Sequence, residues 1–194
     1  MIMKKILLLL ALCMTLIACK AQQIYPLNTY YKDVVNYSYM KDLNNYLSLY
    51  VGTYKTIYMG DEITLYITKE DKMLIDTRLG GRKYYQDVLH VKYTVKKITT
   101  GAVLQDNQNP VNPDINEIIS MGTNDLDNNS LALSYSGTNC RVGSGRITIK
   151  KISNTQISWS YYPNDSLFTN GDCPGNPDIK IYLPDTENLV FTKQ

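Results

Sequence analysis

Few side chains in this sequence have the types and spacing that catalysis needs. His90 is the single histidine, and no serine or cysteine is placed beside it by a hydrolase motif. The acidic pairs Asp61-Glu62 and Glu70-Asp71 could act together as acid and base, but both lie in predicted turns. We therefore interpret His90 as a surface residue beside a strand and predict no catalytic residue.

The acidic stretch from Asp125 to Asn129 has the alternating oxygen ligands that begin a calcium-binding loop. Ser130 stands where such a loop needs glycine, and Ser136 stands where it needs a bidentate glutamate. We interpret the stretch as an Asn-rich and Asp-rich turn, and we expect no metal site and no cofactor.

The N-terminus carries an export signal. Residues 6–18 form an apolar run of 13 residues behind Lys4 and Lys5. A helix of that length rises about 20 Å, which is too short for a hydrocarbon core of about 30 Å. The segment is therefore predicted to be cleaved rather than to span a membrane.

Leu16-Ile17-Ala18-Cys19 ends this signal and resembles the lipobox of bacterial lipoproteins. The resemblance implies cleavage between Ala18 and Cys19 and a diacylglyceryl group on the Cys19 sulfur, and two or more acyl chains anchor a protein firmly in a membrane. An ordinary secretory signal with an incidental Cys19 is the alternative. Lys20, in place of aspartate, favours the outer membrane by analogy with Gram-negative sorting. Lys20 to Gln23 contain no acid that would indicate surface display, so we expect a periplasm-facing protein.

Net charge gives no argument for nucleic acid as a partner. Lys4 and Lys5 leave with the signal, which lowers Lys plus Arg from 20 to 18, equal to the 18 Asp plus Glu. The charge is nevertheless uneven, because residues 98–139 contain five acids and no Lys or Arg. A basic stretch precedes them and comprises Arg78, Arg82, Lys83, Lys92, Lys96 and Lys97. This pattern fits either two solvated faces or a polarised binding surface.

Tyrosine is the dominant aromatic residue, with 17 Tyr against two Phe and one Trp. Tyr favours strands and can bury its ring while its hydroxyl stays hydrated. Packing on a β-sheet explains this usage, and so does a face that contacts glycans or peptides.

Two cysteines remain after Cys13 leaves with the signal and Cys19 is assigned to lipid. Cys140 and Cys173 would form a disulfide in an oxidising compartment. A bridge across this separation would contribute about 3–4 kcal/mol in the chain-entropy model. Two free thiols are the alternative, and a metal site lacks further ligands nearby.

Strand patterns dominate the rest of the chain. Apolar residues alternate with period two in Ile63–Ile67, Val91–Val95, Leu131–Tyr135, Arg146–Ile149, Ile157–Tyr161 and Ile179–Leu183. Glu70 to Lys72 is predicted to turn the chain between two strands, and Asp42 is predicted to cap a short helix over residues 43–47. We predict an all-β fold, a single antiparallel meander of about nine or ten strands that forms a barrel or a sandwich. Residues 1–18 are the signal, 19–41 a tether and 42–194 the β-domain.

Gly52-Thr53-Tyr54 opens the first predicted strand and resembles the Gly-x-Trp opening of lipocalin-like barrels, with Tyr54 in place of Trp. Residues 43–58, 84–89 and 183–194 resemble an uncharacterised family of small Bacteroidota-type lipoproteins with a lipocalin-like β-fold. That family has no assigned activity, so the resemblance implies no catalytic residues. Asp165-Ser166-Leu167 resembles the acceptor pattern for O-glycosylation in Bacteroidota, with Ser166 as the acceptor.

Three functions follow as hypotheses. The first is a non-enzymatic envelope lipoprotein that binds a protein or glycan through loops or a Tyr-rich face. The second is a lipocalin-like carrier with an apolar ligand inside the barrel. A hydrolase is disfavoured by the single histidine and by the lack of a motif. An interior filled with side chains would exclude the carrier.

Overall fold

The computed structural model describes residues 21–77, 81–109, 115–121, 129–165, 173–175 and 177–194. Strands make up nearly all of its regular structure, and the described helices are single 3-10 turns. In chain order the elements are β1 (Ile24–Pro26), η1 (Tyr31–Asp33), β2 (Tyr39–Lys41), η2 (Leu47–Tyr50), β3 (Gly52–Tyr58), β4 (Asp61–Thr77), β5 (Arg82–Lys97), β6 (Val103–Asp106), β7 (Ile118–Ser120), β8 (Ser130–Tyr135), η4 (Asn139–Arg141), β9 (Gly145–Lys151), β10 (Gln156–Pro163) and β11 (Leu189–Lys193).

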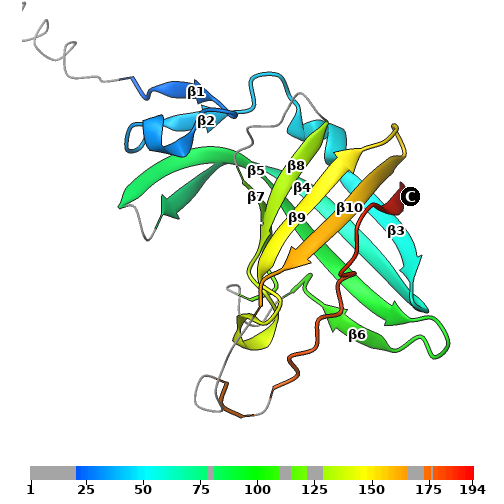
Figure 1. Ribbon diagram of the computed structural model, residues 1–194. Helices are drawn as coiled ribbons and strands as arrows, with labels where there is room; N and C mark the ends of the chain where they lie inside the picture. Colours follow the sequence, from blue (N-terminus) through cyan, green and yellow to red (C-terminus); the bar gives the residue numbers. More distant parts are fainter. Residues whose placement is uncertain (1–20, 78–80, 110–114, 122–128, 166–172, 176) are drawn as a thin grey trace, which may run out of the picture.

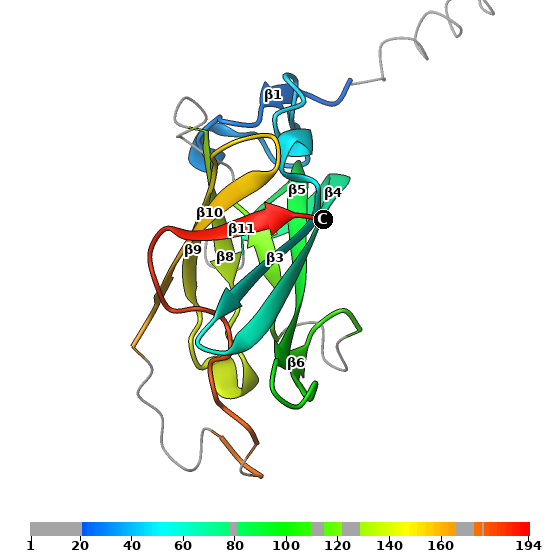
Figure 2. The same ribbon diagram turned by 90° about the vertical axis from the view of Figure 1, so that its right-hand side faces the viewer.

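Eight antiparallel strands close into a barrel. Their order is β5-β4-β3-β11-β10-β9-β8-β7, and the pair His90–Ile119 joins β7 back to β5. Figure 2 shows β11 lying between β10 and β3, which brings the C-terminus beside the strand that opens the barrel. The predicted antiparallel meander is confirmed, and the barrel fits a lipocalin-like fold.

The barrel core follows from the alternation in the sequence. Ile63, Leu65 and Ile67 are at most 2% exposed, as period two requires for one inward face of β4. Large rings fill the centre, and Trp159 packs against Phe191 at a centroid distance of 5.8 Å. Each such side chain contributes on the order of 1.5–3 kcal/mol through burial.

The opening of β3 explains the Gly-x-Tyr pattern. Gly52 has a φ of 147°, and a Cβ there would lie 2.4 Å from Cε of Lys193. The Lys193 ammonium passes over this glycine, donates to the Val51 carbonyl at 2.7 Å and lies 5.7 Å from the centroid of the Tyr54 ring. Tyr54 is fully buried in the core, at the place where the resemblance implied an inward aromatic ring.

An extension projects from one end of the barrel. The β4–β5 hairpin continues beyond the barrel, β2 adds to β5 in parallel, and β1 adds to β2 in parallel. Figure 1 shows β1 and β2 beside this hairpin, at the opposite end of the molecule from β6. The extension has a small core of its own around Val34, Met40 and Tyr84. Residues 24–26 and 39–41, which we expected to lie in the tether, are therefore strands of the sheet.

Three local expectations differ from the structure. Residues 70–73 form a bulge within the single strand β4, not a turn, because β5 continues to pair with the chain on both sides. Residues 179–183 pair with no described strand, and their alternation reflects packing of Ile181 and Leu183 against the barrel core. The short helix predicted over residues 43–47 is absent, and the 3-10 turn η2 forms later, at residues 47–50, with Tyr46 as its N-cap.

The predicted disulfide is present. Cys140 and Cys173 are bonded across a sequence separation of 33 residues. The bond joins η4, in the β8–β9 connection, to the segment that leads into β11. Asn139 donates to the Asp178 carbonyl at 2.7 Å and adds a second link between the same two segments.

Candidate functional site

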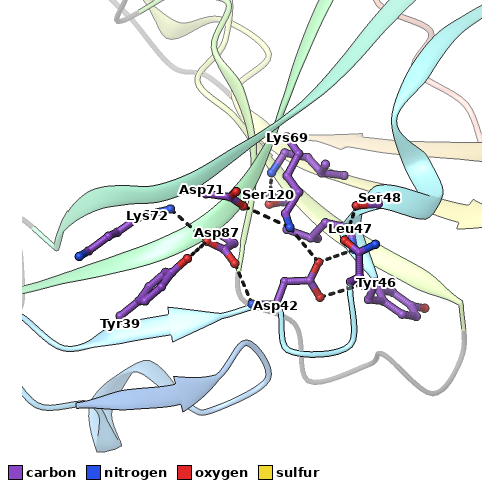
Figure 3. A network of polar contacts seen from close by, with 12 residues as sticks. Tyr39, Asp42, Tyr46, Leu47, Ser48, Lys69, Asp71, Lys72, Asp87 and Ser120 are labelled. Carbon is purple, nitrogen blue, oxygen red and sulfur yellow. Dashed lines mark hydrogen bonds and ion pairs between the residues drawn. The ribbon is translucent and has the colours of Figure 1, made fainter. Parts of the chain in front are cut away.

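A buried polar network fixes the extension to the barrel (Figure 3). Asp87 on β5 is 1% exposed and accepts from the Tyr39 hydroxyl at 2.5 Å, the Lys72 amide at 3.0 Å and the Asp42 amide at 2.9 Å. These donors come from β2, from the bulge of β4 and from the residue after β2. One carboxylate on β5 thus binds two other segments, β2 with the residue that follows it and the bulge of β4, and links them where the extension meets the barrel.

Asp42 forms the second half of this network. Its carboxylate accepts from the amides of Tyr46 and Leu47 at 2.8 and 2.9 Å, four and five residues along the chain. The N-cap of η2 is Tyr46 and not Asp42, so Asp42 supports the start of this turn from a distance and is not the cap that the sequence predicted. Lys69 lies 3.5 Å from the same carboxylate and 3.2 Å from Asp71. The turn that Asp42 supports places Leu47 in the barrel core.

The extension presents one face to a groove of about 790 Å³. The floor consists of side chains that share a face by alternation: Arg82, Tyr84 and Gln86 of β5, Ile75 and Thr77 of β4, and Met40 of β2. Cross-strand pairing places Ile75 opposite Tyr84 and Met40 opposite Gln86. A floor that combines apolar and aromatic side chains with a few polar groups is typical of a ligand site.

Two walls rise from this floor. Thr29 to Lys32, in the β1–β2 connection, form one wall, and Ile119 to Met121, at the end of β7, form the other. Tyr30 and Tyr31 meet edge to face at a centroid distance of 5.0 Å and are 45% and 38% exposed. Exposed rings at the rim of an apolar groove offer contact area to a ligand at little entropic cost.

The opposite face of the extension is organised differently. Lys72 lies over the rings of Tyr39 and Tyr85 at 5.7 and 5.4 Å, and Lys83 pairs with Asp76 at 3.0 Å. Burial, followed by the hydrogen bond to Asp87, raises the pKa of the Tyr39 hydroxyl. The polar groups of this face therefore already have partners within the protein.

Buried tyrosines form a separate cluster inside the barrel. The hydroxyls of Tyr93 and Tyr135 lie 3.2 Å apart, and both donate to Oδ1 of Asn116 at 3.1 and 3.0 Å. Burial raises the pKa of Tyr135 to about 12 and also raises the pKa of Tyr93. This cluster fills the interior where a carrier would need an open chamber.

His90 lies on the outer surface, as the sequence suggested. Its Nε2 lies 3.0 Å from Glu70 at the edge of a smaller hollow of about 370 Å³. Within the described ranges, no three His, Cys, Asp or Glu side chains come together as a metal site. Likewise, no helix in the described part of the chain is long and apolar enough to cross a membrane.

Several residues named from the sequence lie outside the described residues: Ala18, Cys19, Arg78, Asp125 to Asn128, and Ser166. The rest of the basic stretch does not form one surface. Arg82 faces the groove, Lys83 pairs with Asp76 on the opposite face, and Lys97 pairs with Asp61 on the barrel at 2.8 Å. The groove was not predicted from the sequence. The alternation of Arg82, Tyr84 and Gln86, which places all three on one face of a strand, is the sequence signal that could have indicated it.

Comparison with known families gives one match, which covers residues 3–194. The chain belongs to DUF6705, a family of unknown function. No curated protein and no solved structure matches it. The function of this DUF6705 barrel therefore has to be inferred from its own geometry, in which the groove on the extension is larger than the hollow at His90.

Proposed function

We propose that the protein is a non-enzymatic binding module that uses the groove on the extension as its ligand site. The observation that carries this proposal is the groove itself. Its volume of about 790 Å³ lies within the range of about 300–1,000 Å³ that is usual for ligand pockets. Its floor is held in place by the Asp87 network, so the site exists before a ligand arrives.

The barrel interior is not part of this proposal. Tyr54, Tyr93, Trp159, Tyr161 and Phe191 are at most 1% exposed and occupy the space along the barrel axis. An apolar ligand of the kind a carrier holds would have to displace these rings. The groove offers apolar area without that cost, so we assign binding to the outside of the barrel.

We further propose that lipid on Cys19 holds the module at the outer membrane, facing the periplasm. The support is the N-terminal sequence, with Ala18 before the cysteine and Lys20 after it. Mass spectrometry of the protein purified from its own envelope should find the acyl mass on a peptide that begins at Cys19. An unmodified Cys19, or a mature chain that begins elsewhere, would contradict the anchor.

The groove is tested by blocking it. Met121 at the rim is 50% exposed, so Met121→Trp adds bulk there without disturbing the core. Ile152→Trp is the matched control, because Ile152 is also 50% exposed and lies between β9 and β10. Native mass spectrometry should find a copurified ligand or partner on the wild type and on the control but not on Met121→Trp. If the Met121→Trp variant still carried the copurified ligand or partner, the groove would not be the binding site.

A further inference from the structure

The charged side chains among the described residues of the groove have one sign. Of the thirteen described residues that line it, Lys32 and Arg82 are cationic and none is Asp or Glu. The hydrogen bond with Tyr30 raises the pKa of the Lys32 ammonium, and the Arg82 guanidinium acts in the opposite direction, so the two cations lie within electrostatic range of each other. Positive charge is thus concentrated at one part of an otherwise apolar and aromatic site.

Each of these cations keeps donors available for a ligand. The ammonium of Lys32 lies 5.8 and 6.0 Å from the ring centroids of Tyr30 and Tyr31 and is exposed to solvent. One nitrogen of Arg82 donates to the Val34 carbonyl at 2.8 Å, and the guanidinium has further N–H groups beyond that bond. Arg82 is therefore oriented by the protein and still able to bind an anion.

We infer that the ligand of the groove is an amphipathic anion, with an apolar chain or ring against Ile75, Ile119 and Met121 and one carboxylate or phosphate at Lys32 and Arg82. This inference rests on the groove being the binding site proposed above. A purely apolar ligand would remove water from Lys32 and Arg82 without offering either cation a partner, and removing an unpaired charge from water costs free energy. A neutral sugar would use the rings of Tyr30 and Tyr31 but not the charges.

The test uses octyl phosphate and octanol, which share a chain and differ in the anionic group. The full-length protein is kept in phosphatidylcholine nanodiscs so that any lipid anchor stays in place. The methyl resonances of Met40 and Met121 report occupancy of the groove by NMR, because both side chains line it. We expect both resonances to shift saturably with octyl phosphate and to require about ten-fold or more octanol.

Two variants with the same change of charge test whether the effect depends on the position of Lys32 in the groove. Lys32 is exposed, so Lys32→Glu should leave the fold intact and weaken octyl phosphate binding about ten-fold or more. Lys150→Glu makes the same change of charge on an exposed position of β9 and should have no effect. Equal affinity for octanol, or unchanged binding by Lys32→Glu, would overturn the inference.

Two further arms identify the source of the anion. Inorganic phosphate alone should not shift Met40 or Met121, because it lacks the apolar part. Vesicles that contain phosphatidylglycerol would overturn the inference if they bound through Lys32 while octyl phosphate left both methionines unchanged. If no amphiphile binds but Met121→Trp still loses its copurified ligand, the ligand class is wrong and the groove remains the binding site.

Discussion

Asp87→Asn is the sharpest test of the architecture, because one buried carboxylate joins the extension to the barrel. An asparagine can still accept from Tyr39 and Lys72 with its single carbonyl oxygen. Its NH₂ group then faces the backbone N–H of Asp42, which loses its acceptor at that position. One charge-assisted hydrogen bond is lost, and two donors face each other in a site that is 1% exposed.

The expected loss of stability follows from these contacts. An unsatisfied buried donor costs about 1–3 kcal/mol, and removal of negative charge beside the Asp42 carboxylate returns part of that. We expect a net loss of about 2 kcal/mol, which for a chain of this size lowers Tm by about 4–8 °C. The control is Asp71→Asn, whose side chain is 71% exposed and pairs with Lys69 at 3.2 Å. We expect it to cost less than about 0.5 kcal/mol.

Urea denaturation measures both variants, and hydrogen exchange locates the effect. Asp87→Asn should increase exchange of the amides in β2, because two of the three bonds to Asp87 come from Tyr39 and Asp42 at the ends of that strand. Exchange in β9 and β10 should change only as far as global stability does. Equal stability of the Asp87 and Asp71 variants, or unchanged exchange in β2, would refute the role of Asp87 in attaching the extension to the barrel.

Three further predictions concern the barrel. Replacing both Cys140 and Cys173 with serine should lower the free energy of unfolding by about 3–4 kcal/mol in urea, and a loss below about 1 kcal/mol would show that the two linked segments are held by packing instead. Tyr54→Phe should raise stability by about 1 kcal/mol, since its buried hydroxyl has no hydrogen-bond partner among the described residues, and a clear loss would mean that the hydroxyl is satisfied. The pKa of Tyr135 is about 12 in the fold against 10.0 ordinarily, so the unfolded chain ionises first. The stabilisation from Tyr135 is complete below pH 10, and up to about 3 kcal/mol of it is lost as the pH rises from 10 to 12. Tyr135→Phe should make the fall in stability over this range less steep, and the fall that remains comes from other buried tyrosines such as Tyr93.

Much of the barrel could be predicted from local sequence. The alternation of Ile63, Leu65 and Ile67 is enough to define a strand with one buried face, because successive side chains of a strand point to opposite sides. Asp42 could be assigned as an acceptor of nearby free amides, because its carboxylate needs donors, but the turn that it supports begins later than predicted and has Tyr46 as its N-cap. The cysteine pair could be assigned from compartment and count alone.

The candidate site could not be predicted in the same way. Alternation along β5 places Tyr93 and Tyr84 on opposite faces of the strand, but it does not say which face encloses the barrel or that the hairpin extends past the end of the barrel. The extension depends on β4 continuing through the bulge at residues 70–73, a segment that the sequence alone predicts to be a turn.

The sequence by itself therefore determined the class of fold, the disulfide and the expectation of a lipid anchor, because these depend on short patterns. Only the tertiary structure decided where a ligand could bind. Met40 and Tyr84 lie more than 40 residues apart and meet because β2 pairs with β5 in parallel. Asp87 supports that pairing by accepting hydrogen bonds from distant segments, and no local pattern encodes which distant donors a buried carboxylate will find.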